Sequence, residues 1–319
     1  MAEVIGICQW FHFGEHRQVE ATVEALADLE VRHLRTGISW ADYHRTGGIA
    51  WYDWQMRTLA DAGIDLLMSV WHTPPSISLD PERGSTAVPP RRTRDYADFL
   101  DTIIDRWGDC FDDLELWNEP NNPYKWNPQY DPDHRLFASL IEDSAYWAAE
   151  RGKRTVLGGV THLDHEFADR MVGYGVHERV DIVGVHAFPD MWEPAATDWD
   201  HPDHWFGWEH RIETLSRAYD RPVWVTEVGL ATVRKDGGPS REELQETNLL
   251  AAMEAPVERL YWYSMFDLDP KYLAIEEQNG GPREEAEYHM GLIRFDPDYR
   301  IDGREKPAYH ALKAALTAP

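Results

Sequence analysis

Cysteine is nearly absent from this sequence, and long apolar runs are missing altogether. The 319 residues include only two cysteines, Cys8 and Cys110, too few for a disulfide framework, and we interpret both as reduced, buried thiols. No apolar run approaches the length of a membrane-spanning helix, so no membrane partner is expected. Residues 1–6 enter an apolar strand at once and lack the features of a secretory signal, which predicts a cytoplasmic protein unless a signal peptide has been removed.

Positive charge is also scarce. Lysine and arginine together number 31 against 57 aspartates and glutamates, which gives a net charge of −26. Such a charge repels the phosphates of nucleic acids, and we exclude nucleic acid as a partner. Lysine occurs only at positions 125, 153, 235, 271, 306 and 313. An acid-rich, lysine-poor surface suits a salt-rich environment, where ions screen the repulsion, and an ordinary acidic protein is the alternative.

Strand-like and helix-like segments alternate along the whole chain, and no linker, low-complexity tract or internal repeat divides it. We predict strands at 4–10, 31–35, 64–71, 111–117, 155–160, 180–186, 223–226 and 259–266. Helices are predicted at 19–29, 51–62, 94–107, 135–150, 167–174, 208–219, 241–253 and 307–316. This alternation implies parallel strands joined by right-handed crossovers. We therefore predict an α/β fold, a single (β/α)8 TIM barrel that forms one domain over residues 1–319.

Loop lengths predict which end of the barrel carries the functional site. Most connections from helix to strand are very short, whereas the connections from strand to helix include 72–93, 119–134, 187–205 and 267–306. Barrels of this kind build their sites on the strand-to-helix loops, at the C-terminal face of the strands. We therefore expect long loops and the functional site on that face.

Two of the predicted strands end in a glutamate. Residues 114–121 read Leu-Glu-Leu-Trp-Asn-Glu-Pro-Asn and deliver Glu119, and residues 222–229 read Pro-Val-Trp-Val-Thr-Glu-Val-Gly and deliver Glu227. Each glutamate stands where an apolar strand turns into a loop. A pair of carboxylates that face each other is the arrangement with which a glycosidic bond is cleaved. The two motifs resemble the acid/base and nucleophile signatures of the clan A glycoside hydrolases, and the first is similar to that of family 39, the β-xylosidases and their endo-acting relatives.

The resemblance implies a retaining β-glycoside hydrolase without a cofactor, acting on an oligosaccharide, a polysaccharide or another glycoside. It makes Glu227 the nucleophile and Glu119 the acid/base, and it makes Asn118 a ligand of the sugar 2-hydroxyl. Arg35 matches the arginine that lies beneath the nucleophile and keeps it ionised. Repulsion from an ionised Glu227 would raise the pKa of Glu119.

Two histidines at strand ends are further candidates for substrate binding. Many clan members carry a histidine where His72 and His186 stand, and we interpret both as sugar contacts, with purely structural histidines as the alternative. Together with His12 they could suggest a metal trio, but the spacing of acidic and histidine residues does not support one, and no metal is predicted.

Tryptophans are unusually frequent near the predicted site. Of 15 in the chain, Trp262 resembles the tryptophan that floors the subsite of the cleaved sugar, and Trp40 and Trp126 are further candidate substrate contacts. Trp10, Trp71, Trp192 and Trp205 lie at strand ends or in strand-to-helix loops, where flat rings can stack on sugars.

One position departs from the resemblance. Several clan families place a tyrosine two residues after the strand-six histidine, near the nucleophile, and this chain has Phe188 there. The hydroxyl comes from elsewhere, with Tyr261 and Tyr263 as candidates, or it is absent.

Two other functions use the same residues. A transglycosylase would pass the sugar to an acceptor other than water, and a sugar-binding barrel would have lost catalysis. Release of the aglycone from an activated aryl glycoside separates an enzyme from a binder, and product analysis with added acceptor separates transferase from hydrolase. The motifs do not specify the sugar, the choice between exo and endo action or the oligomeric state.

The net charge of −26 leads to a prediction about salt. Because added ions screen the repulsion within the folded chain, we expect the melting temperature to rise between low and high ionic strength. A thermal melt in a series of salt concentrations checks this. A flat or falling melting temperature would favour the ordinary acidic protein over one adapted to salt.

Overall fold

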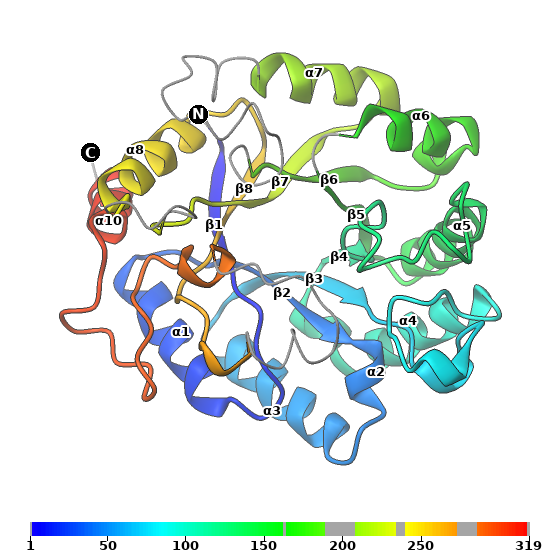
Figure 1. Cartoon of the computed structure of the whole chain (residues 1–319), viewed down its shortest axis with the longest axis horizontal. Helices are drawn as coiled ribbons and strands as arrows, with labels where there is room; N and C mark the ends of the chain where they lie inside the picture. Colours follow the sequence, from blue (N-terminus) through cyan, green and yellow to red (C-terminus); the bar gives the residue numbers. More distant parts are fainter. Residues whose placement is uncertain (1, 162–163, 189–207, 234–239, 273–285, 318–319) are drawn as a thin grey trace.

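The structure is a computed structural model, and it describes residues 2–161, 164–188, 208–233, 240–272 and 286–317. Eight parallel strands form one closed barrel in the order β1 to β8, and helices surround it (Figure 1). The strands are β1 (Val4–Cys8), β2 (His33–Ser39), β3 (Asp65–Trp71), β4 (Asp113–Leu116), β5 (Arg154–Thr161), β6 (Ile182–His186), β7 (Val223–Val228) and β8 (Arg259–Tyr263). The helices of the described residues are α1 (His16–Asp28), α2 (Trp40–Tyr43), α3 (Gly48–Asp61), α4 (Arg94–Trp107), α5 (Arg135–Glu150), α6 (His165–Gly173), α7 (Trp208–Tyr219), α8 (Glu242–Met253) and α10 (Pro307–Thr317). The predicted (β/α)8 fold is confirmed.

The predicted elements differ from the observed ones mainly at the strand ends. Strand β2 continues four residues beyond the predicted end at Arg35, so Arg35 lies inside the strand rather than at its end. The short helix α2 follows directly and was not predicted. Ser39 is the N-terminal cap of α2, because its hydroxyl accepts a hydrogen bond from the backbone N–H of Asp42 at 3.1 Å.

The strand register changes near the candidate site. Strand β6 pairs with β7 in regular register up to Val185 opposite Val225, and the register then shifts so that His186 stands opposite Glu227. A second shift, between β7 and β8, falls between Val225 and Val228. Such irregularities re-aim side chains at the end of a strand. The shift between β6 and β7 brings His186 and Glu227 to neighbouring positions.

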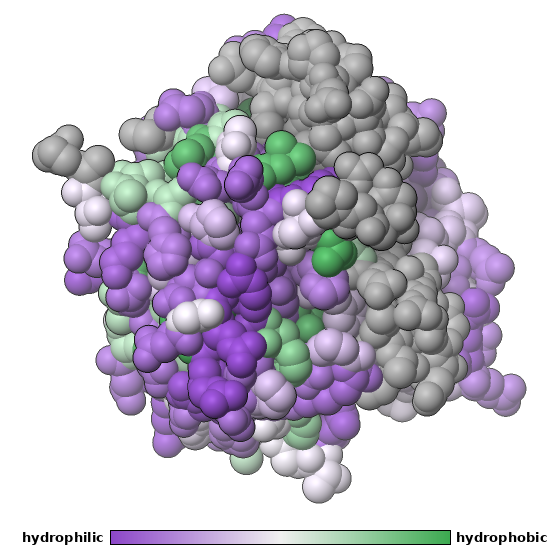
Figure 2. Space-filling view, turned by 60° about the vertical axis from the view of Figure 1, so that its left-hand side comes forward, coloured by the Kyte–Doolittle hydropathy of each residue, from purple (hydrophilic) through white to green (hydrophobic). Residues whose placement is uncertain are grey.

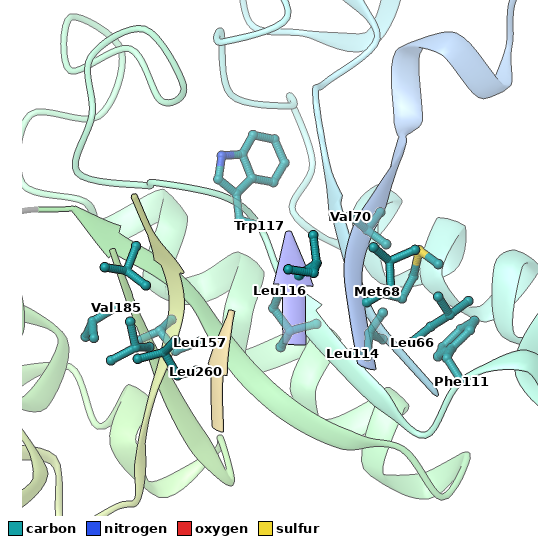
Figure 3. Close-up of a cluster of buried hydrophobic side chains, with 14 of the residues drawn as sticks. Leu66, Met68, Val70, Phe111, Leu114, Leu116, Trp117, Leu157, Val185 and Leu260 are labelled. Carbon is teal, nitrogen blue, oxygen red and sulfur yellow. The ribbon is translucent and has the colours of Figure 1, made fainter. Parts of the chain in front are cut away.

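The two faces of β4 separate the hydrophobic layer from the barrel interior. Leu114 and Leu116 belong to the main hydrophobic cluster and lie beside Met68 and Val70 of β3 (Figure 3). Because side chains alternate along a strand, Glu115 turns to the opposite face. That face is the inside of the barrel, where a second cluster of buried residues includes Cys8, Leu67, Val156, Ile182, Trp224, Tyr261 and Tyr263.

The outer surface is strongly polar. In the view of Figure 2, hydrophilic residues dominate and apolar residues are scattered among them. Among the described residues, no helix is both long enough and apolar enough to span a membrane.

Candidate active site

The first glutamate of the predicted pair follows β4 on a strained stretch of backbone. Trp117 and Glu119 have positive φ angles of 78° and 47°. A residue other than glycine in this left-handed region costs about 1–3 kcal/mol, and such residues cluster at functional sites. Glu227 lies on β7 itself, one residue before the strand ends. Both carboxylates therefore reach the face on which the sequence placed the site.

Glu119 and Glu227 lie close to each other, and His186 is near both. One side-chain oxygen from each of Glu119 and Glu227 and a ring nitrogen of His186 all lie within 4.8 Å of one another. All three side chains are largely buried, with 12% of the Glu119 side chain and 7% of the Glu227 side chain exposed. The fold thus brings together two carboxylates that are 108 residues apart in the sequence (227 − 119).

Arg35 connects the second glutamate to a third, buried one. Its guanidinium has no exposed surface and donates to Glu227, to the amide oxygen of Asn118 at 2.7 Å, and through Nε to Glu115 at 2.9 Å. Burial by itself would lower the pKa of Arg35, but the charges of Glu115 and Glu227 raise it well above its usual value. Arg35 is therefore a permanent cation beneath Glu227.

One carboxylate oxygen of Glu227 accepts three hydrogen bonds. Its Oε1 accepts from Arg35, from the indole Nε1 of Trp10 at 3.2 Å and from the thiol of Cys8 at 3.6 Å. Burial, followed by the charge of Glu227, raises the pKa of Cys8 well above its usual value, so the thiol keeps its proton and acts as a donor. In the described part of the chain, the other oxygen, Oε2, has one polar neighbour, Nδ1 of His186 at 3.5 Å.

Glu119 is held by different partners. Its Oε1 is 2.8 Å from Nδ1 of His186, and its Oε2 accepts from the amide of Asn122 at 2.8 Å. Burial works to raise the pKa of Glu119, but the hydrogen bond and charge of His186, together with Lys125 and Asn122, outweigh it and lower the pKa to about 2. From the sequence, repulsion by Glu227 was expected to raise the pKa of Glu119. The direction is opposite because His186 contacts the Glu119 carboxylate directly.

The position of His186 depends on a glycine in the neighbouring strand. A Cβ atom at Gly159 of β5 would stand 2.0 Å from Nε2 of His186, so any larger residue there would displace the ring. Nε2 is buried and has no hydrogen-bond partner in the described part of the chain. Nδ1 faces two carboxylates and must carry a proton to donate to them. The structure places His186 beside both Glu119 and Glu227, and the sugar contact expected of it stays a prediction.

Asn118 and His72 lie at the strand ends, as the sequence predicted. Asn118 is buried to 4% exposure and gives its amide oxygen to Arg35, which leaves its N–H groups for another acceptor. His72 bonds through Nδ1 to the hydroxyl of Ser39 at 3.1 Å. Burial, followed by the charge of Lys125, lowers the pKa of His72 to about 3, so the ring is neutral at ordinary pH.

The three tryptophans singled out from the sequence are buried in the hydrophobic layer. Trp40, Trp126 and Trp262 are exposed by 2%, 1% and 0%, and all three belong to the main hydrophobic cluster. Trp126 donates to Asp131 at 3.0 Å, and Trp40 stacks on Phe99. These three rings therefore pack within the hydrophobic layer, and their contact with a sugar stays a prediction.

The partly exposed tryptophans near the pair are Trp10 and Trp71. Their rings meet edge to face with centroids 5.7 Å apart, and the ammonium group of Lys125 lies 4.8 Å from the centre of the Trp71 ring. Trp192 and Trp205 fall outside the described residues.

Neither candidate tyrosine forms a hydrogen bond with Glu227 in the described part of the chain. The hydroxyl of Tyr263 donates to Glu287 at 3.2 Å, and that of Tyr261 accepts from Arg259 at 3.4 Å. Phe188 packs edge to face against Tyr263. Trp10 provides the uncharged N–H donor to Glu227.

Sequence reasoning missed several residues of this site. Glu115, Cys8 and Asn122 were not assigned a role, although Glu115 stands inside the first quoted motif. A glutamate in an apolar strand that faces the interior needs a buried cation, and Arg35 in β2 is the matching signal. Asn122 and Cys8 carry no such signal, because their contacts arise from loops and strands far apart in the sequence.

Glu119, His186 and Glu227 are the one group in the described residues whose atoms are close enough to hold a metal ion. Arg35 already places a fixed positive charge against Glu227, and His186 already bonds Glu119. Two members of this donor set therefore already have partners within the protein, Glu227 in Arg35 and Glu119 in His186.

Comparison with solved structures gives the same fold. The chain is similar to a monomeric β-xylosidase from Caulobacter crescentus CB15, with a TM-score of 0.66 and 15% identity over 99% of this chain and 68% of that one. It is similar to a family 39 glycoside hydrolase from Bacteroides cellulosilyticus WH2, with a TM-score of 0.65 and 17% identity over 98% of this chain and 63% of that one. A family 1 β-glucosidase from Thermotoga maritima gives a TM-score of 0.63 at 13% identity over 98% of this chain and 97% of that one.

The sequence itself matches no protein-family model and no curated protein. The chain spans less than two thirds of the Bacteroides structure, at 63%. At these identities the likeness is one of fold, and this chain has the barrel fold of the xylosidase and glucosidase structures.

The lowered pKa of Glu119 predicts how its contribution to stability depends on pH. Because the folded pKa, about 2, lies below the unfolded value, the carboxylate stabilises the fold above roughly pH 4.5 and loses this contribution as pH falls. The Glu119→Gln variant has no carboxylate at this position, so its stability lacks this pH-dependent contribution. We therefore expect the difference in free energy of unfolding between wild type and this variant to narrow from about pH 6 to about pH 3.5.

Urea unfolding at the two pH values measures this difference. Glu243→Gln, which removes one exposed carboxylate from α8, controls for the loss of a charge. A difference that stays constant or widens towards acid would contradict the ion pair between Glu119 and His186.

Proposed function

We propose that this protein is a retaining β-glycoside hydrolase of clan A, closest to family 39 in its strand-four motif. The observation that carries the proposal is the pair of carboxylates, Glu119 and Glu227, whose nearest oxygens lie within 4.8 Å at the C-terminal ends of β4 and β7. Retaining enzymes have carboxyl groups about 5–5.5 Å apart, and inverting ones about 6.5–9.5 Å, because inversion needs room for a water molecule. The short separation favours retention. We further propose that residues 1–319 form one catalytic domain.

In the first step, a carboxylate oxygen of Glu227 forms a bond to the anomeric carbon while the bond to the leaving oxygen breaks. Glu119 gives its proton to that oxygen, so the aglycone leaves as a neutral alcohol. Arg35 forms an ion pair with Glu227 and orients it for the attack. The N–H groups of Asn118 are free to donate to a sugar hydroxyl beside the reacting carbon.

In the second step, water attacks the anomeric carbon of the glycosyl-enzyme. Glu119, now a carboxylate, takes a proton from the water, and Glu227 leaves as a carboxylate. Nδ1 of His186 bonds Glu119 at 2.8 Å, so the proton that Glu119 exchanges lies within a hydrogen-bonded Glu119–His186 pair. Asn122 donates to Oε2 of Glu119 at 2.8 Å and helps to hold the carboxyl group in place for the proton transfer.

The similar solved structures support a glycosidase, and these enzymes are named for different sugars. They include a β-xylosidase, an exo-β-1,4-mannosidase from Opitutaceae bacterium strain TAV5 and a β-glucosidase. A panel of 2,4-dinitrophenyl β-glycosides of xylose, glucose, galactose and mannose, together with oligosaccharides, identifies the sugar. Added acceptor alcohols report transfer in place of hydrolysis.

Removal of the nucleophile gives the first test. We expect Glu227→Ala to lose nearly all turnover while it still binds substrate, because no group can attack the anomeric carbon. Azide should restore part of the activity and give an α-glycosyl azide, since the small anion fits the space of the missing carboxylate. Release of dinitrophenolate and NMR of the product measure both effects.

Glu115→Gln serves as the matched control, since Glu115 is also buried against Arg35 but lies below the proposed attacking group. Azide should not rescue it. A Glu227→Ala variant that keeps more than a small fraction of wild-type activity would show that Glu227 is not the nucleophile.

Removal of the acid/base gives the second test. Glu119→Gln keeps the shape of the side chain but transfers no proton, so its damage should depend on the leaving group. With dinitrophenyl glycosides the first step should stay fast, the second should stall, and covalent intermediate should accumulate. With sugar leaving groups the first step itself should fail.

The pH profile adds an independent reading of the same variant. The basic limb of kcat/KM should disappear, because it reports proton loss from the Glu119–His186 pair. Pre-steady-state bursts and pH profiles check this. Equal losses on good and poor leaving groups, with the basic limb intact, would exclude Glu119 as the acid/base.

A further inference from the structure

The two oxygens of Glu227 have unequal surroundings. Oε1 accepts hydrogen bonds from Arg35, Trp10 and Cys8, whereas Oε2 faces only Nδ1 of His186, at 3.5 Å. A carboxylate oxygen has about two lone pairs, so three donors leave Oε1 little electron density for a new bond. Among the described residues, no other donor contacts Oε2. The reacting oxygen is therefore Oε2, and the three donors at Oε1 decide the direction in which it points.

Trp10 donates an uncharged N–H group to Oε1, and its ring has a fixed position. Its ring occupies the space that a side chain at Gly37 would fill, because a Cβ atom there would stand 2.4 Å from Cζ3 of Trp10. The guanidinium of Arg35 lies 5.0 Å from the ring centre, and Trp71 packs against the ring edge to face. The indole can therefore turn neither away from Glu227 nor toward solvent without losing these contacts.

The backbone at Trp10 is held as well. The side chain of Gln9 donates to the carbonyl of Trp10 at 2.9 Å and accepts from the backbone N–H of Phe266 at 3.1 Å. Gln9 has no exposed surface. The segment after β1 is thus tied to the segment after β8, and this tie holds the indole N–H in line with Glu227.

We propose that Trp10 is a positioning residue of the hydrolase, whose indole N–H orients Glu227 and stabilises its charge when the glycosyl-enzyme breaks down. This inference rests on the proposed function. It assigns to Trp10 a role different from that of a surface on which the sugar stacks. Trp10 takes the place of the hydroxyl donor that Phe188, Tyr261 and Tyr263 do not provide.

The role predicts which step a change at Trp10 affects. In the second step, the bond between Oε2 and the anomeric carbon breaks and the electron pair returns to the carboxylate. A hydrogen bond to a charged acceptor contributes roughly 1.5–3 kcal/mol, so loss of the N–H should slow this step about tenfold or more. Loss of one of the three donors at Oε1 also destabilises the charged form of Glu227 relative to its neutral form, so the acidic limb of kcat/KM should move to higher pH.

The experiment compares Trp10→Phe with wild type on the fastest dinitrophenyl β-glycoside of the panel. We expect a burst of dinitrophenolate followed by a slow steady state, slower reactivation of the 2-fluoroglycosyl-enzyme and a shifted acidic limb. Trp147→Phe is the matched control, because it removes an indole from the outer face of α5, where the side chain is 39% exposed. It should behave as wild type.

A second variant separates the N–H from the bulk of the ring. Replacement of Trp10 by β-(3-benzothienyl)alanine keeps the shape of the indole and exchanges only the N–H for sulfur, so the packing against Gly37 and Arg35 stays. This variant should show the same slow reactivation and the same shift. If it matches wild type in both, the N–H has no role and the proposal is overturned.

Two further outcomes distinguish the inference from its rivals. If Trp10→Phe raises KM and leaves the acidic limb and reactivation unchanged, Trp10 is a stacking surface and the proposal fails. If the fluoroglycoside does not label Glu227 in wild type, the proposed function itself fails. If Glu227 of wild type is labelled normally but the Trp10 variants behave like Trp147→Phe, the proposed function stands. Only the inference about Trp10 is then contradicted.

Discussion

The candidate site depends on one buried cation. Arg35 has no exposed surface, and its guanidinium lies between the buried carboxylates of Glu115 and Glu227. Each of these charges is costly to remove from water, and each is tolerated because the others are present. Removal of one partner from such a cluster costs about 3–5 kcal/mol, since it leaves an uncompensated buried charge. Arg35 therefore has two roles. It compensates the negative charge of the two glutamates inside the barrel, and it fixes the position of Glu227, the carboxylate proposed to attack the sugar.

Space inside the barrel is the second constraint. Gly37 makes room for Trp10, and Gly159 makes room for His186, since a Cβ atom would stand within 2.4 Å of a ring atom in either case. The positive φ angles of Trp117 and Glu119 belong to the same arrangement. Local preference is given up at these positions so that several side chains can converge on two carboxylates. Rings and carboxylates held this closely need little reorganisation during a reaction.

The pairing of His186 with Glu119 changes the protonation chemistry that two facing carboxylates alone would have. Repulsion between two glutamates pushes one of them toward its protonated form. Here the histidine bonds one carboxylate at 2.8 Å and lies 3.5 Å from the other, and the pKa of Glu119 is lowered to about 2. The acid/base function we propose therefore belongs to the Glu119–His186 pair rather than to a single carboxyl group.

The sequence by itself determined the fold and the two glutamates. Eight alternations of apolar strand and amphipathic helix are a local pattern, and the helices 94–107, 135–150 and 208–219 were predicted with the bounds that the structure has. Local sequence also shows a carboxylate at the end of a strand, which is why Glu119 and Glu227 could be named. Asn118 stands inside the first motif, Arg35 was inferred from the resemblance and its place in the second strand, and the structure places the two in contact with each other.

Only the tertiary structure decided what surrounds those glutamates. Trp10, Cys8, Arg35 and His186 come from β1, β2 and β6 or the residues just after them, and they meet Glu227 only when the barrel closes. Register shifts at the ends of β6 and β7 decide which side chains face each other there. The same reason explains the tryptophans, because loop position could not tell the buried Trp40, Trp126 and Trp262 from the partly exposed Trp10 and Trp71. Burial and contact are properties of segments distant in sequence, and a local pattern holds no information on which of them will pack together.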